Sequence, residues 1–346
     1  MRIVKRVQTT NKTRIINISI ALLLAVLTVS VFLLLINKNP LTIYPAMFIA
    51  IFGNSFRLMT LLKYIVPLVI VSLGISVAFR MRFWNIGGEG QLIMGAIFAT
   101  YFALFHDYLP AIVLLPIMAL ASILGGGLYA IVAAILKTRF KTNETIVTLM
   151  LNYIALQFLT YLQYVAWKEG NFPKIPIFKD NAVLPSYNGI SSAVFIAFAV
   201  VVFSYIILNK SRLGFEISVV GESDKTAEYV GIDLKKITLL MMFISGGIIG
   251  LAGFTQVAGN IKTLSTGVTL GVGFTGVVIA WISKLDVKRI IFISILFACL
   301  VQATGALDSL FQIPPYSVDV IQAIVLFYIL GCDFFNDYQL VKGGNL

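Results

Sequence analysis

The stretch Ile15–Ile36 has the sequence IINISIALLLAVLTVSVFLLLI, which is 22 residues without a charged side chain. A helix rises about 1.5 Å per residue, so this run can cross a hydrocarbon layer of about 30 Å. Five basic residues precede it, and no small-residue cleavage site of the signal-peptide type follows it. We therefore predict a retained transmembrane helix whose basic start stays in the cytoplasm.

The composition of the whole chain extends this prediction. Of the 346 residues 59% are hydrophobic and only 12% are charged, whereas a soluble domain has about 25% charged residues. Such a chain cannot cover the surface of a soluble globule, which excludes a lone soluble domain, a disordered tail and a disulfide scaffold. The chain has two cysteines and one histidine, and their spacing in the sequence does not match that of a metal-binding motif. The predicted fold class is an all-α polytopic membrane protein.

Ten apolar runs are candidates for membrane spans. Several of them are short, so about 8 to 10 transmembrane helices with some re-entrant or broken Gly-rich segments are expected. The runs are Ile15–Ile36, Ile65–Phe79, Gln91–Phe105, Leu109–Leu136, Thr145–Trp167, Ile190–Leu208, Ile237–Gly259, Val268–Ser283, Ile290–Leu307 and Val320–Cys332.

The distribution of basic residues predicts the topology. The net charge is +11, which in a soluble protein would suggest nucleic acid. With ten spans and an internal N-terminus, however, the cytoplasmic segments hold 19 of the 26 Lys and Arg residues and the external segments hold 7. This asymmetry follows the positive-inside rule. We therefore expect both termini to lie in the cytoplasm. The basic residues are expected to face the lipid bilayer, and nucleic acid is not expected as a partner.

Asn209–Lys236 is the longest polar stretch and lies on the predicted cytoplasmic side. Ser223 is placed to cap a short helix, and Gly231 is placed to end it. Ala227 and Val230 fall on one face of that helix. The residues alone leave two readings open: an amphipathic docking helix, or a solvated loop that links two spans.

Residues 85–91, NIGGEGQ, form the strongest candidate for a polar site within the membrane. Ionisable residues at membrane depth are costly and mark functional sites. Three glycines within four positions disfavour a regular helix, so we expect a discontinuous element that is buried or lines a cavity. A second Gly-interrupted segment surrounds Val268–Gly276, and such paired segments indicate a transport path. The alternative is tight helix packing, which we prefer for the Gly246–Gly250 pair.

The run that starts at Thr142 contributes further candidates. Thr142 is predicted to cap the helix, with Glu144 near its positive N-terminus. Asn152 lies deeper in the same helix, where an amide either bonds a neighbouring helix or contacts a polar solute. Asn152 and Tyr153 together suit a ligand with hydroxyls or ring nitrogens.

Several motifs do not occur in the sequence. It has no G-x-x-x-x-G-K-[ST] phosphate loop and no Ser/His/Asp or Cys/His catalytic signature. No chain of intramembrane carboxylates suggests an ion-driven carrier. We therefore expect a non-enzymatic transport protein that contains no cofactor and either takes its energy from a partner or has no energy source.

Four stretches of the chain resemble the bacterial ABC-importer permeases of the branched-chain amino acid and ribose type. Within that superfamily the chain looks most similar to the nucleoside and simple-sugar permeases that work with basic-membrane-protein lipoproteins. The matching residues are Arg80–Gly95, Thr142–Ala155, Gly214–Ile232 and Gly271–Gly276, together with Ile313-Pro314-Pro315. The resemblance runs in order from about residue 65 to residue 332.

The resemblance implies a set of partners in the bacterial cell membrane. These are a cytoplasmic ABC ATPase subunit that carries ATP-Mg, a second permease subunit, which is expected to be a different chain, and an external substrate-binding lipoprotein. Two other readings remain: a branched-chain amino acid permease, and, in another class, an integral membrane enzyme or lipid flippase.

The resemblance also implies where the functional residues lie. Coupling to the ATPase is assigned to Gly214, Glu216, Gly221, Ala227, Tyr229 and Gly231. The translocation path is assigned to Asn85, Glu89, Gln91, Asn152, Tyr153 and Phe274.

The predicted segments follow from these assignments. They are a cytoplasmic N-terminus 1–14, a first transmembrane helix 15–36, a permease core in two parts (60–208 and 237–332), a coupling loop 209–236 between them, and a cytoplasmic tail 333–346.

Overall fold

The computed structural model describes residues 2–5, 11–187 and 189–341. The chain forms two compact units, one from Met1–Leu61 with Ala298–Leu346 and one from Leu62–Phe297. We call these the terminal unit and the core unit. The predicted segments 1–14 and 333–346 lie partly outside the described residues.

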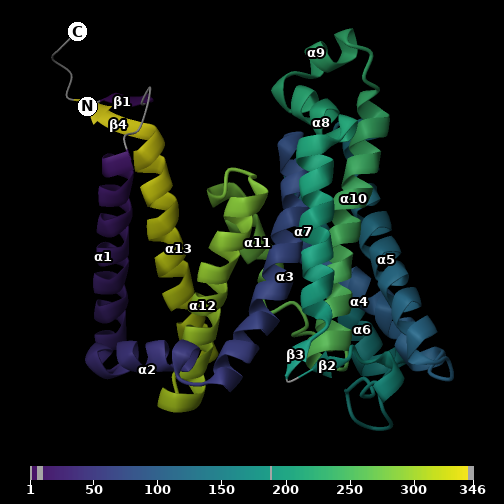
Figure 1. The fold of residues 1–346 in the computed structure, drawn as a ribbon, viewed down its shortest axis with the longest axis horizontal. Coiled ribbons are helices and arrows are strands. Elements are labelled where there is room, and N and C mark those ends of the chain that lie inside the picture. Colours follow the sequence, from purple (N-terminus) through teal and green to yellow (C-terminus); the bar gives the residue numbers. More distant parts are fainter. Residues whose placement is uncertain (1, 6–10, 188, 342–346) are drawn as a thin grey trace. The chain divides into compact units, whose positions relative to one another are not determined.

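Helices account for most of the described chain, in agreement with the predicted fold class (Figure 1). Among the described residues, seven helices are long and apolar enough to cross a membrane, and an eighth span is possible if the bent pair Ser19–Leu35 and Pro40–Phe52 counts as one. Val272–Ile282 and Tyr316–Cys332 are shorter apolar helices. The chain is a multi-pass membrane protein, and each of the ten apolar runs overlaps one of these helices.

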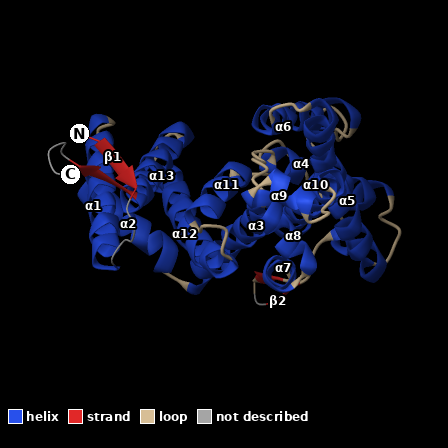
Figure 2. Ribbon diagram, turned by 90° about the horizontal axis from the view of Figure 1, so that it is seen from above, coloured by secondary structure: helices blue, strands red, loops and turns tan. Residues whose placement is uncertain are grey.

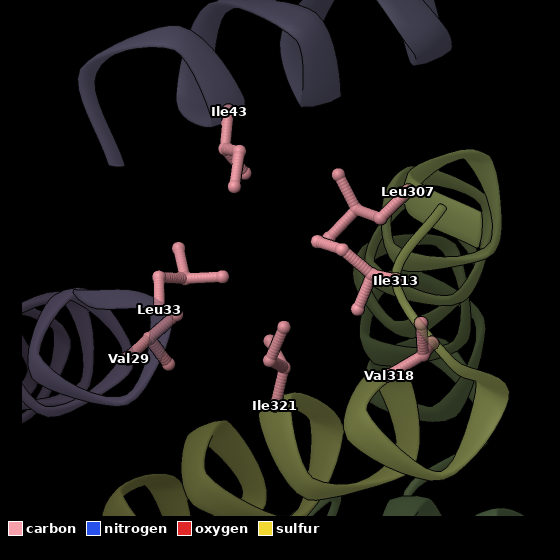
Figure 3. Close-up of a cluster of buried hydrophobic side chains, with 7 residues drawn as sticks. All are labelled: Val29, Leu33, Ile43, Leu307, Ile313, Val318 and Ile321. Carbon is pink, nitrogen blue, oxygen red and sulfur yellow. The ribbon is translucent and has the colours of Figure 1, made fainter. Parts of the chain in front are cut away.

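The terminal unit contains α1 (Asn11–Leu35), α2 (Pro40–Phe52) and α13 (Pro315–Asp337), together with the end of α12 (Val287–Phe311). Its buried core joins α1 and α2 to the α12–α13 corner, as Figure 3 shows. The core residues are Val29, Leu33, Ile43, Leu307, Ile313, Val318 and Ile321. Strands β1 (Arg2–Lys5) and β4 (Tyr338–Val341) pair antiparallel at the other end of α1 and α13, away from this core (Figure 1).

Helix α2 was not expected from the sequence. It is bent by 116° from α1, because Asn37 adopts a left-handed conformation at φ 57° and Asn39 caps a new helix with Pro40 in its first turn. Its 13 residues are too few to span the bilayer. The Lys38 ammonium donates to the Phe311 carbonyl at 2.6 Å, which ties this corner to the end of α12.

The core unit is built from antiparallel helices. It begins with most of α3 (Ser55–Arg80) and continues with α4 (Gly88–Phe105), α5 (Ala111–Phe140) and α6 (Glu144–Tyr161). Then follow the short strands β2 (Ser186–Tyr187) and β3 (Ile190–Ser191), α7 (Ala193–Lys210), α8 (Arg212–Glu222) and α9 (Asp224–Tyr229). Finally α10 (Leu234–Phe254) and the short α11 (Val272–Ile282) lead to the start of α12. Helices α6 and α7 lie on opposite sides of the α4–α10 pair (Figure 2).

Helices α4, α5 and α10 pack closely at the centre of this unit. A side chain at Gly250 would overlap the Ser122 carbonyl oxygen and come within 3.0 Å of the Gly126 Cα atom. A side chain at Gly95 would overlap the Gly250 backbone in turn. Small residues allow such backbone approach in a bilayer, so the predicted packing role of Gly246 and Gly250 is confirmed.

Gly250→Ala tests this packing. The added methyl group must push α10 away from α5, at a cost of about 1–3 kcal/mol. We expect the thermal unfolding temperature in detergent to fall by several degrees. The matched control is Gly305→Ala in α12, where none of the described atoms lies within 4 Å of the added Cβ atom. The control should be neutral or slightly stabilising, and equal Tm values for the two variants would contradict the packing role.

Candidate translocation and coupling sites

Asn85 and Gln91 form a reciprocal amide pair at the start of α4. Asn85 Nδ2 donates to Gln91 Oε1 at 3.1 Å, and Gln91 Nε2 donates to Asn85 Oδ1 at 3.0 Å. Asn85 Oδ1 also accepts the Gly87 N–H at 3.0 Å, and Asn85 Nδ2 lies 3.4 Å from the Ser245 hydroxyl of α10. Both amides are buried. The pair therefore fixes the turn between α3 and α4 and ties it to α10.

Asn152 of α6 holds the same turn from another side. Its Nδ2 donates to the Ile86 carbonyl at 2.9 Å, and its Oδ1 accepts the Gly90 N–H at 2.8 Å. Thr148, one turn earlier, accepts the Ile86 N–H at 3.2 Å. These bonds satisfy backbone groups that a helix start leaves unpaired. The expected break is present at residues 81–87, between α3 and α4. Gly88 and Gly90 lie just after it, in the first turn of α4, where the bond from Gly90 to Asn152 supports the helix.

Glu89 joins α4 to α11. One carboxylate oxygen accepts the Gly273 N–H at 3.0 Å and the Phe274 N–H at 3.4 Å. A negative charge at a helix N-terminus is stabilised by the helix dipole, by up to about 2 kcal/mol in buried geometry. A side chain at Gly273 would overlap the Glu89 backbone, so glycine is needed for this approach. Glu89 thereby anchors the short helix that follows the second Gly-rich segment.

The residues assigned to the path from sequence fall into two groups. Asn85, Glu89, Gln91 and Asn152 are all buried around the start of α4, where Asn85 and Gln91 bond each other and Asn152 and Glu89 each bond backbone groups. We call these four residues the α4 network. Tyr153 and Phe274 are 58% and 47% exposed and lie at its margin. Sequence reasoning missed Thr148 and Ser245, although each is a polar residue within an apolar run and could have been noticed for that reason.

Helices α8 and α9 project from the same end of the core unit as the start of α10 (Figure 1). Ser223 caps α9 by accepting the Thr226 N–H at 3.3 Å, and Gly231 follows the helix at φ +80°, so both predicted signals are confirmed. Helix α8 was not predicted. Ser211 caps it by accepting the Gly214 N–H at 3.2 Å, and Arg212 pairs with Glu216 at 2.7 Å on its surface.

Most of the residues that were assigned to coupling hold α8 and α9 against other helices of this chain. A side chain at Gly214 would overlap the Ile207 and Leu208 carbonyls at the end of α7, and one at Gly221 would overlap the Arg80 carbonyl at the end of α3. Ala227 is fully buried. Tyr229, by contrast, is 94% exposed. Of this set, Tyr229 is therefore the large side chain that is free to meet another protein.

The ends of α3, α5 and α10 form a cleft with this segment. Its volume is about 720 Å³, and Arg82, Lys141, Glu222 and Asp233 are among the residues that line it. Next to this lining, the Arg80 guanidinium donates to the Leu208 carbonyl and to Asn209 Oδ1. The end of α3 is thereby bound to the end of α7.

The cap of α6 differs from the prediction. Asn143, not Thr142, caps this helix by accepting the Thr145 and Ile146 N–H groups at 3.0 and 3.3 Å. Glu144 lies in the first turn as expected and pairs with Lys137 of α5 at 2.6 Å. The residue types at 142 and 143 are both good caps, and the backbone turn decides between them.

Asp233 caps α10 and is exposed. The Lys236 backbone N–H, followed by the Lys236 ammonium 3.4 Å away, lowers the pKa of the Asp233 carboxyl. The carboxylate is therefore ionised at neutral pH.

Comparison with known proteins identifies the family. Residues 57–330 match the family model described as branched-chain amino acid transport system / permease component. This match covers most of the chain, and the chain belongs to this family of ABC transporter permeases.

The relatives include permeases for sugar and nucleoside. The glucose ABC transporter permease protein TsgB13 of Haloferax volcanii is 30% identical over 89% of this chain and 85% of its own length. The guanosine permease protein NupP of Bacillus subtilis is 30% identical over 90% and 91%. The nucleoside permease protein NupB of Lactococcus lactis is 29% identical over 92% of both chains. No solved structure matches the chain.

Two substitutions of Glu89 test the anchoring of α11. Glu89→Leu leaves the Gly273 and Phe274 N–H groups without their acceptor, at about 1–3 kcal/mol for each group, so we expect transport by the assembled complex to be lost. In a cysteine-free background, Phe274→Cys should then react faster with a thiol reagent. Glu89→Gln keeps an acceptor oxygen and should retain much of the transport; wild-type transport by Glu89→Leu would contradict this role.

Proposed function

We propose that this chain works with a separate cytoplasmic ABC ATPase and that α8 and α9 dock on it. The exposed apolar side chains of this segment support the proposal, since Phe215, Tyr229 and Val230 are all more than half exposed. Aromatic side chains of this kind are typical anchors in protein interfaces. ATP-Mg would bind to the partner, and the chain itself would perform no covalent chemistry.

The end of the core unit that carries α8 and α9 is assigned to the cytoplasm. Basic residues gather there: Arg82, Lys137, Lys141 and Lys235 all line the 720 Å³ cleft. The positive-inside rule places such an end in the cytoplasm. The opposite end, with β2 and β3, would face the external binding lipoprotein.

The proposed substrate is a nucleoside or a simple sugar. The names of the relatives described above give glucose, nucleosides and guanosine as their substrates. In this chain the Asn85 and Gln91 amides pair with each other, the Asn152 amide bonds the backbone of Ile86 and Gly90, and the Glu89 carboxylate is bound at a helix N-terminus. A path beside such a network presents polar but charge-balanced groups, which suit an uncharged solute with hydroxyls or ring nitrogens.

A reconstituted complex tests the substrate. Proteoliposomes that contain both permease subunits, the ATPase and the binding lipoprotein should accumulate labelled guanosine or glucose in the presence of ATP, and leucine should not compete. ATP hydrolysis without uptake of a nucleoside or a sugar would remove the substrate proposal but not the family assignment.

A branched-chain amino acid is the second candidate, because the family description names that substrate class. A zwitterion would require charged groups or helix ends at its binding site. Two helix N-termini meet at the α4 network. That of α11 is taken by Glu89, and the Gly87 and Gly90 N–H groups at the start of α4 are taken by Asn85 and Asn152, which favours the uncharged solute. Uptake of leucine in the same proteoliposomes would reverse this choice.

Tyr229→Glu tests the docking of α9. Placing a charge at an exposed aromatic anchor should weaken association with the ATPase by about 30-fold or more, measured by pulldown from detergent. The control is Tyr187→Glu, because Tyr187 is 83% exposed in β2, at the other end of the core unit. Unchanged permease Tm in both variants with loss of binding only in Tyr229→Glu is the expected result. Equal binding by both variants would contradict the docking proposal.

A further inference from the structure

A proline interrupts the backbone hydrogen bonds of α3. Pro67 lies inside this helix and is buried. Proline has no N–H group, so the carbonyl of the residue four positions earlier, Lys63, loses its helical donor. Asn260 supplies a donor instead, since its Nδ2 group lies 3.1 Å from the Lys63 carbonyl oxygen. A side chain from η3 (Thr255–Ile261), the π-helix that continues α10, therefore completes the backbone bonding of α3.

The π-helix η3 is bonded to a second part of the core unit. The Leu184 N–H donates to the Ala258 carbonyl at 2.9 Å. The Phe178 N–H donates to the Lys262 carbonyl at 2.9 Å. The loop between α6 and α7 is therefore tied to the chain on either side of Asn260. π-Helical turns are rare and occur frequently at functional sites, and this one joins the loop to α3.

The contact between η3 and α3 is not fully paired. Gln256 lies four residues before Asn260 and is 1% exposed. Its Oε1 atom accepts a hydrogen bond from Asn260 Nδ2, whereas its Nε2 group has no hydrogen-bond partner among the described residues. A buried unpaired donor is costly. Such a contact is less stable than a fully paired one, as expected of a contact that opens while the protein works.

The next part of α3 is held more firmly. The Ser245 hydroxyl of α10 donates to the Gly74 carbonyl at 2.7 Å, and a side chain at Gly74 would overlap Ile249. Pro67 lies seven residues, or about 10 Å, before this crossing. Two points therefore attach α3 to α10, a tight crossing at Gly74 and the Asn260 amide at Lys63, and the proline lies between them.

We propose that Asn260 is a positioning residue that latches residues 62–66 of α3 to η3, and that these residues turn about Pro67 when the latch opens during transport. A helix bends most readily at proline. The loop between α6 and α7, near which an external partner would dock, is bonded to η3, so a load on this loop acts on Asn260. The inference rests on the proposed function, because the ATPase and the binding lipoprotein would drive the movement.

Spin labels test the movement in the reconstituted complex. In a cysteine-free background, Lys63→Cys and Lys262→Cys place labels at two exposed positions, one on each side of the latch. EPR spectroscopy should give one distance without ATP, and a second, longer distance after addition of ATP, vanadate and the binding lipoprotein. An unchanged distance in a complex that still accumulates solute would overturn the hinge and leave the proposed function in place.

Pro67→Ala separates a hinge from a merely structural kink. Alanine restores the N–H group that the Lys63 carbonyl lacks, so the helix should become stiffer. We expect an equal or higher Tm, loss of the second spin–spin distance, and a several-fold fall in ATP-driven uptake. The control is Pro116→Ala, because Pro116 also lies inside a helix of the core unit but is exposed; it should leave uptake unchanged. Uptake at the wild-type rate by Pro67→Ala would refute the hinge.

Asn260→Leu removes the latch. Hydrogen exchange in a peptide that covers residues 62–70 should rise several-fold, and the assembled complex should continue to hydrolyse ATP with reduced uptake. Asn181→Leu is the matched control, since its Nδ2 group also donates to two acceptors, the Asp107 and Leu109 carbonyls at 2.6 and 2.8 Å. This control should leave exchange in α3 unchanged.

The two variants of the latch and the proline should depend on each other. In the Pro67→Ala background the Lys63 carbonyl has its helical donor again, so adding Asn260→Leu should raise the exchange of residues 62–70 little further. An equal rise in both backgrounds would show that Asn260 does not act through this carbonyl and would refute the latch. No rise in either background would refute it as well.

Discussion

The contact of α10 with α4 and α5 is the constraint on which the core unit depends. Lipid tails are as apolar as leucine side chains, so helices in a bilayer gain little by hiding apolar surface from lipid and associate mainly through close packing. Gly250 lies where the backbones of α4 and α5 both approach α10, with Gly95 on one side and Gly126 on the other. No larger residue fits at this crossing without moving a helix.

The α4 network follows from this packing. A helix that starts inside the bundle has N–H groups that lipid cannot satisfy. Asn85 and Asn152 supply acceptors for the backbone around Gly87 and Gly90, and each amide is itself paired. A buried polar network that is well satisfied fixes one arrangement of its helices. The α4 network therefore fixes the turn between α3 and α4 and the start of α11.

The sequence predicts best what depends on neighbours along the chain. The apolar run Ile15–Ile36, the Ser223 cap and the Gly231 terminator each act within one or two turns, and the structure has a helix, a cap and a terminator at these places. The packing of Gly246 and Gly250 was also predictable, because small residues at that spacing line one helix face.

Features that depend on distant contacts were predicted less well. The glycines at 88 and 90 weaken a helix by propensity, but Asn152 from α6 supplies the bonds that stabilise it. Helix α8 was missed because its polar face resembles a loop, and it is held by the carbonyls of α7 and α3. Helix α2 was missed because its 13 residues contain prolines and are too short for the span criterion. For α4 and α8, tertiary contacts outweigh local preference.

The same contacts show how a force on α8 would travel through the core unit. Gly214 places the start of α8 on the carbonyl groups that end α7, and Gly221 places its last turn on the Arg80 carbonyl that ends α3. Arg80 binds these two ends together through Leu208, so α8 cannot shift without moving both. Asn85 follows Arg80 by only five residues and begins the α4 network. Because α10 is held by its glycine contacts whereas the middle of α7 borders an apolar groove, we expect a movement of α8 to pass into α7 and the α3–α4 turn rather than into the centre of the bundle.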